Sequence, residues 1–169
     1  EKENEKVIDA TNKVIMPGLI NTHAHIAMSI FRGTFEGCNL YTWLSEKIWP
    51  IEDKLTEEDV YNASMISIIE MISTGTTCVN DHYFFSKTIR EALEKANLRA
   101  VITRVLMDSD GKEASEKRIK EFKELYETRC AKNDLITYTV SPHSLYTCSD
   151  DVLKNARQLA LEYNLPIHI

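Results

Sequence analysis

The sequence predicts an α/β fold in which short strands alternate with amphipathic helices and pair in parallel. Five short apolar runs resemble buried strands, and four segments with helical periodicity separate them. The resulting order is β-α-β-α-β-α-β-α-β, and strands joined through helices form a parallel sheet with right-handed crossovers. No G-x-G-x-x-G or P-loop motif follows any of these strands, so neither dinucleotide nor P-loop function is indicated.

The expected elements follow from apolar periodicity and from capping residues. The strands of the sheet are expected at 19–22, 76–81, 99–107, 135–140 and 165–169, and two shorter strands before them at 7–9 and 13–16. The helices are expected at 56–75 after a Thr56 cap, 86–96 after a Ser86 cap, 113–130, and 150–163 after a Ser149 cap. The apolar face of the first helix is expected to comprise Val60, Ala63, Ile66, Ile69 and Ile72. Residues 26–55 are expected to form a long loop, and loops of that length are usually functional.

The composition is that of one globular domain. Hydrophobic residues make up 43% of the 169 positions and charged residues 27%. The net charge of -6 argues against nucleic acid or an anionic membrane as a partner. No membrane span or signal peptide is recognisable. The cysteines form no C-x-x-C motif and indicate reduced thiols in a cytoplasmic protein; they are Cys38, Cys78, Cys130 and Cys148.

Two histidines follow the first expected strand of the sheet. Successive strand side chains alternate between faces, so His23 and His25 are expected to point the same way. Two imidazoles at the end of a strand can share one metal ion. An H-x-H spacing alone is weak evidence, but here it follows an apolar run and a Pro17-Gly18 break.

The stretch P-G-L-I-N-T-H-A-H resembles the first-strand metal motif of the amidohydrolase superfamily, whose members are metal-dependent (β/α)8 barrel hydrolases. The resemblance implies that residues 1–17 end a small β-sandwich and that 18–169 form the N-terminal half of a barrel, through the fifth strand. A complete barrel needs roughly 250 residues, so we expect a fragment that lacks the remaining ligands and general base and is itself inactive. It further implies one Zn²⁺ or Fe²⁺ held in part by His23 and His25.

Two further histidines lie at expected strand ends. His143, in S-P-H-S-L-Y-T-C-S, resembles a histidine of adenosine-type deaminases that contacts the substrate ring or the departing group and is not a direct metal ligand. The alternative is a capping or packing histidine. His168 is tempting as a third metal ligand, but alignment with the family pattern P-x-x-I-H-x-x-E places the ligand one residue beyond Ile169. His168 is therefore expected a layer deeper in the barrel, below the metal. No motif assigns His82.

The loop after His25 resembles 5′-methylthioadenosine/S-adenosylhomocysteine deaminases over F-R-G, Trp43-Leu44 and W-P-I-E, and the resemblance runs from Val14 to Ile169. It implies that Trp43 packs on the nucleoside and that Glu52 accepts hydrogen bonds from the ribose hydroxyls. A carboxylate suits a diol because it only accepts hydrogen bonds. The alternative for Glu52 is an ordinary surface carboxylate.

Two arginines are candidates for a substrate carboxylate, such as the homocysteine end. Arg104 lies in an apolar strand, where a charge needs a partner. Its alternative role is a structural ion pair with Asp81 or Asp108. Arg118 is a weaker candidate for the same anion.

The implied reaction is hydrolytic deamination of an adenine nucleoside. Water activated by the metal adds to C6 of the purine, a glutamate moves protons, and ammonia leaves. The alternatives are an amidohydrolase of another heterocycle, such as a triazine, guanine or cytosine, and a catalytically silent metal-binding domain. The sequence ranks neither the nucleosides nor the metals, and it leaves open whether the protein forms a homo-oligomer.

Overall fold

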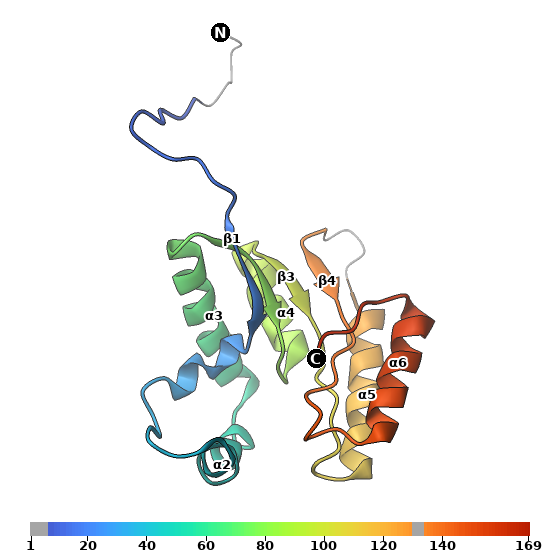
Figure 1. Ribbon diagram of the computed structural model, residues 1–169. Coiled ribbons are helices and arrows are strands. Elements are labelled where there is room, and N and C mark those ends of the chain that lie inside the picture. Colours follow the sequence, from blue (N-terminus) through green and yellow to red (C-terminus); the bar gives the residue numbers. More distant parts are fainter. Residues whose placement is uncertain (1–6, 130–133) are drawn as a thin grey trace.

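The computed structural model describes residues 7–129 and 134–169, and its centre is one parallel sheet (Figure 1). The strands are β1 (Leu19–Ala24), β2 (Thr76–Asp81), β3 (Arg99–Ile102) and β4 (Ile136–Tyr138), in the spatial order β1-β2-β3-β4. Each neighbouring pair is parallel. A single parallel bridge between Val140 and Ile167 then brings the fifth apolar run beside the end of β4. The predicted parallel α/β fold is confirmed.

Four long helices connect and cover the strands, as predicted. They are α3 (Glu57–Ser73), α4 (Ser86–Ala96), α5 (Lys112–Glu127) and α6 (Asp150–Tyr163). Thr56 caps α3 in a reciprocal capping box with Asp59, and Ser149 caps α6. The predicted Ser86 cap is wrong, because Phe85 occupies the N-cap position and the Ser86 hydroxyl donates to the Thr103 carbonyl at 2.6 Å. None of the described helices is long and apolar enough to cross a lipid bilayer.

The buried face of α3 differs from the predicted one. Val60, Ala63, Ser64 and Ile68 are buried, whereas Ile66, Ile69 and Ile72 are 50–62% exposed. The buried set recurs at a spacing of three to four residues, as expected of one helix face. The helix is apolar on two sides, so periodicity alone could not show which side packs against the segment after β1 and against α4.

Residues 7–18 extend away from the body of the molecule (Figure 1) and contain no strand, so the strands predicted at 7–9 and 13–16 are absent. Val14 and Ile15 are 89% and 86% exposed. A strand needs a partner for its backbone groups, and no strand pairing or bridge of the described residues includes 7–18. The proposed sandwich at 1–17 remains a prediction, and its first six residues lie outside the described part.

The expected long loop after β1 is built from short helical turns. These are η1 (Ile26–Phe31), α1 (Leu40–Thr42), the π-helical η2 (Trp43–Ile48) and α2 (Trp49–Glu52). Pro50 lies in the first turn of α2, a position where proline is tolerated. These turns carry Glu52 to the end of α2, where its side chain is buried.

Two apolar clusters hold the helices to the sheet. One joins α3 and α4 to β2, β3 and β4, and the other joins α5 and α6 to the segments after β3 and β4. The strand predicted at 99–107 ends at Ile102, and only Leu106 pairs again, with Pro142. Cys38, Cys78 and Cys148 are free thiols, whereas Cys130 lies outside the described residues.

Candidate metal and substrate site

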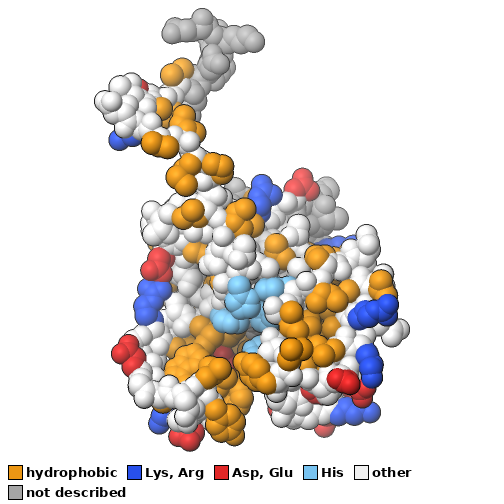
Figure 2. Space-filling view, in the orientation of Figure 1, with side chains coloured by type: hydrophobic (Ala, Val, Ile, Leu, Met, Phe, Trp, Pro, Cys, Tyr) orange, Lys and Arg blue, Asp and Glu red, His pale blue; other side chains and the backbone are white. Residues whose placement is uncertain are grey.

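Five histidine side chains converge where the parallel strands end. His23 lies near the end of β1 and His25 just beyond it, His82 follows β2, His143 follows β4, and His168 follows the bridging residue Ile167. Figure 2 shows histidine side chains gathered at the centre of this face, beside hydrophobic side chains. The carboxyl ends of parallel strands meet at one edge of a sheet, which is why residues far apart in sequence come together here.

Three of these histidines form a compact donor group. His23, His82 and His168 each offer a ring nitrogen, and these atoms lie within 4.8 Å of one another. The Nδ1 of His23 is 2.9 Å from the Nε2 of His168. The His168 ring therefore contacts His23 directly, and the expectation that His168 lies a layer below the metal stays a prediction. The strand there is only a bridge at Ile167, so regular strand spacing does not fix the depth of the following side chain.

His25 is oriented by the backbone that follows β2. Its ring centroid lies 5.0 Å from that of His23, which confirms that the two rings share one side. Its Nδ1 contacts the backbone carbonyl oxygen of His82. A carbonyl only accepts, so Nδ1 must carry the proton and Nε2 is left as the free lone pair, the form that binds metals. Burial lowers the pKa of His25 and favours this neutral form.

His82 is the most enclosed member of the cluster. It is 1% exposed, and neither ring nitrogen has a hydrogen-bond partner within the described part of the chain. Its ring centroid lies 5.0 to 5.7 Å from those of the other four histidines. Burial and the neighbouring imidazoles lower its pKa to about 3, so it is neutral at physiological pH.

His143 is held through one ring nitrogen. Its Nδ1 lies 2.7 Å from the Thr147 hydroxyl, which is itself 2.7 Å from the Ser144 hydroxyl. Its ring faces that of His82 at 5.7 Å. His143 is not part of the three-histidine donor group, and its predicted contact with the substrate stays a prediction.

Glu52 is a buried carboxylate rather than a surface one. It is 9% exposed and accepts a hydrogen bond of 2.5 Å from the Tyr83 hydroxyl. The Tyr83 ring centroid lies 6.3 Å from that of His25, so this tyrosine links Glu52 to the histidine cluster. Burial raises the pKa of Glu52, while the bond from Tyr83 opposes the rise.

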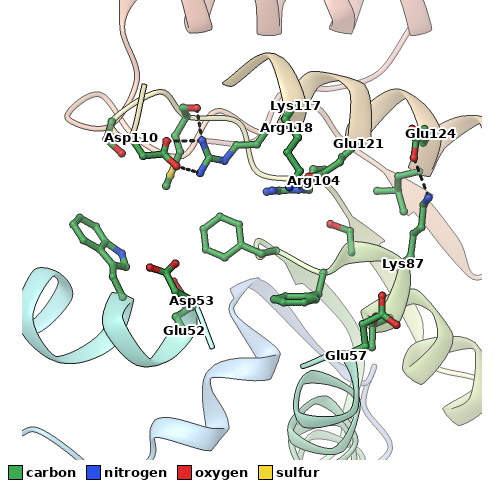
Figure 3. A pocket seen from close by; sticks show the side chains of 18 residues that line it. Glu52, Asp53, Glu57, Lys87, Arg104, Asp110, Lys117, Arg118, Glu121 and Glu124 are labelled. Atoms are coloured by element: carbon green, nitrogen blue, oxygen red, sulfur yellow. Dashed lines mark hydrogen bonds and ion pairs between the residues drawn. The ribbon is translucent and has the colours of Figure 1, made fainter. Parts of the chain in front are cut away.

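Glu52 also lines a cavity of about 720 Å³, a size suited to a small molecule. Figure 3 shows Glu52 and Asp53, at the C-terminal end of α2, on one wall and Arg104 and Arg118 on the opposite wall. Phe84 and Trp49 add apolar surface between them. The cavity therefore combines carboxylate acceptors, two guanidinium groups and aromatic rings.

Both arginines of this wall are already ion-paired. The Nε of Arg104 lies 2.6 Å from Glu121, so the alternative of a structural ion pair is present, but the partner is Glu121 rather than Asp81 or Asp108. The 2.5 Å contact of Arg118 with Asp110 belongs to a bidentate pair. The pKa of Asp110 is lowered by this contact. A substrate carboxylate would have to compete with these acids or use the remaining donors.

Trp43 does not line this cavity. It begins η2 and is half-buried, and Trp49 rather than Trp43 lines the wall. Its contact with a nucleoside remains a prediction.

The donor set fits a transition metal. Imidazole nitrogens suit Zn²⁺ and its neighbours, whereas Mg²⁺ and Ca²⁺ prefer oxygen ligands. Burial lowers the pKa values of His82 and His168 and so favours the neutral form that binds metals, and the ring nitrogens of His82 have no hydrogen-bond partner among the described residues. A histidine cluster at the strand ends of a parallel α/β domain is typical of the class of proteins whose active site lies at the carboxyl edge of the sheet.

The chain belongs to the amidohydrolase family, whose profile matches residues 14–169. A 5'-deoxyadenosine deaminase from Methanococcus maripaludis is 44% identical over 169 residues, covering 99% of this chain and 40% of the relative. A 5-methylthioadenosine/S-adenosylhomocysteine deaminase from Carboxydothermus hydrogenoformans is 44% identical over 170 residues, covering 100% and 39%. The chain thus spans about two fifths of the length of these curated relatives.

Solved structures agree on the fold. A zinc-bound adenosine deaminase from Xanthomonas campestris superposes with a TM-score of 0.82 at 32% identity, over 90% of this chain and 35% of that one. A guanine deaminase from C. acetobutylicum, with guanine bound, gives a TM-score of 0.79 at 21% identity, over 89% and 38%. The second likeness shows the fold alone.

Sequence reasoning missed the central position of His82. The only available signal was its place immediately after a buried strand, at the level of the other strand-end histidines. No spacing motif pairs it with His23 or with His168, because the three come from different strands.

Proposed function

We propose that the full-length protein carrying this chain is a metal-dependent hydrolytic deaminase of adenine nucleosides. Family membership and the names of the relatives support this activity. The candidate substrates are S-adenosylhomocysteine, 5′-methylthioadenosine, 5′-deoxyadenosine and adenosine, which share an adenine and a ribose diol. The products are the inosyl compound and ammonia. The location is proposed to be the cytoplasm.

In this proposal the chain is the first half of a (β/α)8 barrel at 18–169, preceded by the end of a β-sandwich at 1–17. The parallel order β1-β2-β3-β4 and the bridge to Ile167 support the barrel. The general base and the remaining metal ligands would come from elsewhere in the full-length protein, so the 169 residues alone would not catalyse.

His23 and His25 are proposed to hold the metal, Zn²⁺ or Fe²⁺. When bound, such a cation lowers the pKa of water and so supplies a nucleophile at neutral pH. The chain itself orients the donors, because the Nδ1 proton of His25 is committed to the His82 carbonyl. His143, held through Nδ1 by Thr147, is proposed to hydrogen-bond through its other nitrogen to the purine or to the departing ammonia.

The burial and position of Glu52 are the observations that support the substrate assignment. A buried carboxylate that lines a cavity, one tyrosine away from the histidine cluster, suits a ribose diol. An ionised carboxylate offers about four lone-pair sites. Tyr83 occupies one of them, so two hydroxyl donors can still be accepted. Arg104 and Arg118 are proposed to bind a carboxylate tail, and Trp43 to contact the nucleoside.

The test uses the full-length, zinc-loaded protein and follows the ultraviolet change as adenine becomes hypoxanthine. We expect deamination of 5′-methylthioadenosine, 5′-deoxyadenosine and S-adenosylhomocysteine. Glu52→Gln should lower kcat/KM by about 10- to 100-fold, the cost of losing a charged hydrogen-bond acceptor. Asp53→Asn is the matched control, because its carboxylate lines the same cavity without a ribose role, and it should stay within about twofold of the parent.

Activity that survives Glu52→Gln unchanged would favour an amidohydrolase of another heterocycle, such as a triazine, guanine or cytosine. A metal-loaded protein that deaminates none of these nucleosides would contradict the substrate assignment. His23→Ala should abolish activity together with metal binding.

A further inference from the structure

Asp81 is a buried acidic residue that the proposed reaction does not use. It is the last residue of β2, and its side chain is 2% exposed. Its Oδ1 accepts a hydrogen bond of 2.7 Å from the backbone N–H of Ile26, the residue that follows His25. A carboxyl group is costly to bury, so the contact that it makes has to compensate for the lost hydration. The contact made here fixes the backbone beside one of the two histidines proposed to hold the metal.

Strand pairing alone does not fix the direction of the His25 side chain. The pairing of β1 with β2 is irregular between Asn21 and Ala24, and His25 lies beyond the last paired residue. Its backbone, with φ -123° and ψ 75°, is outside the strand and helix regions, and its side chain does not cap the helical turn η1 that follows. Regular alternation places side chains only within a ladder. A metal ligand at this position therefore needs other contacts to hold its orientation.

The end of β2 and the residue after it supply these contacts. The backbone N–H of His82 donates to the Ala24 carbonyl at 2.8 Å, and the His82 carbonyl accepts the proton on Nδ1 of His25. The Asp81 carboxylate adds the bond from the N–H of Ile26. Each of the residues 24, 25 and 26 is thus bonded to residue 81 or 82, and the Asp81 bond is the one of the three that a side-chain substitution can remove.

We propose that Asp81 is a positioning residue for the metal site, and that it acts through the N–H of Ile26 to hold the His25 ring toward the cation. The inference rests on the metal-binding part of the proposed function, in which His25 is a ligand. Successive side chains of an extended chain point to opposite faces, so Asp81 points away from the face on which the His82 ring meets the ring of His23. Asp81 therefore acts through the backbone, without a contact to the cation.

The test measures metal binding. The full-length protein is stripped with a chelator and titrated with Co²⁺, whose visible absorption reports its ligands, and the affinity is obtained by chelator competition. Asp81→Leu removes both oxygens at a similar side-chain length. It should weaken Co²⁺ binding about 10- to 100-fold, the usual cost of losing a group that orients a metal ligand. Asp81→Asn keeps an oxygen that can accept from Ile26, so its affinity should stay within about fivefold of the parent, the difference between a charged and a neutral acceptor.

A double-mutant cycle shows whether Asp81 acts through His25. His25→Ala removes the imidazole that Asp81 is proposed to orient. In that background Asp81→Leu should change the remaining Co²⁺ affinity by less than about twofold, because the two substitutions remove one and the same interaction. Losses that add in full would show that Asp81 supports the site by another route, and they would overturn the proposal.

The stability of the stripped protein separates positioning from a general loss of structure. Ser86→Ala is the matched control, because the buried Ser86 hydroxyl also bonds to a backbone group, the Thr103 carbonyl. It should lower the melting temperature and leave the Co²⁺ affinity unchanged. Asp81→Ala gives a second variant without the acceptor, and it should lose as much affinity as Asp81→Leu. A lower melting temperature with parental Co²⁺ affinity in both Asp81 variants would overturn the proposal.

The two proposals can fail separately. A protein that deaminates adenine nucleosides and keeps its Co²⁺ affinity in Asp81→Leu would refute the positioning role and leave the proposed function intact. A protein that deaminates none of these nucleosides, but loses Co²⁺ affinity in Asp81→Leu and loses no more in the His25→Ala background, would support the positioning role and refute the proposed substrates.

Discussion

Replacing Tyr83 by phenylalanine removes one hydroxyl from the buried contact with Glu52 and leaves the ring in place. The ring packs beside Phe84, with 5.2 Å between centroids, and is 3% exposed. A hydrogen bond to a charged group contributes about 1.5–3 kcal/mol, and one between neutral groups about 0.5–1.5 kcal/mol. The free energy of unfolding should therefore fall by about 2 kcal/mol where Glu52 is ionised and by about 1 kcal/mol where it is protonated.

The pH dependence of this stability loss follows from the pKa of Glu52. Burial raises that pKa, and the hydrogen bond from Tyr83 partly lowers it again. A carboxyl whose folded pKa exceeds the unfolded value of about 4.3 favours the folded state most at low pH, and this contribution disappears as the pH rises through the folded pKa. Tyr83→Phe raises the folded pKa further. Its deficit should consequently be larger at about pH 8 than at about pH 5, because the ionised carboxylate has lost its donor.

Urea unfolding of the full-length protein at the two pH values measures the loss in the free energy of unfolding with Glu52 ionised and with Glu52 protonated. Tyr61→Phe is the control, because the Tyr61 hydroxyl makes no hydrogen bond to a carboxylate within the described part of the chain, and the effect of this substitution on stability should not depend on pH. In a Glu52→Gln background the Tyr83→Phe deficit should drop to about 1 kcal/mol at both pH values. An equal deficit at pH 5 and pH 8 in the parent background would refute the assigned ionisation of Glu52.

Two further substitutions test the packing that positions the site. Gly18→Ala should be strongly destabilising, because a Cβ there would lie 2.2 Å from the Thr77 Cγ2 and 2.9 Å from the Thr77 Cβ. The double variant with Thr77→Ala removes the closer contact and should recover part of the lost urea midpoint; no recovery would show that the close approach of residues 18 and 77 is not the cause. Phe122→Ala should cost about 3–5 kcal/mol, since the side chain is 0% exposed in the cluster that holds α5 and α6. A loss below about 1 kcal/mol in thermal unfolding would contradict that packing.

The order of the elements was readable from the sequence because it depends on local signals. Apolar runs, capping residues such as Thr56 and Ser149, and the alternation of strand side chains that pairs His23 with His25 all act over a few residues. The same signals gave wrong predictions where two local arrangements were equally compatible with the sequence. The helix α3 is apolar on two sides, and Phe85 rather than Ser86 occupies the N-cap of α4 because Ser86 bonds to Thr103.

The sequence by itself determined the parallel α/β class, the strand-end histidines and the candidate carboxylate Glu52. The tertiary structure alone decided which histidines meet, that Tyr83 bonds to Glu52, and that the partner of Arg104 is Glu121. The physical reason is that these contacts join residues from different strands and helices. Their distances depend on how the strands are registered and where each one ends, and no spacing along the chain records either.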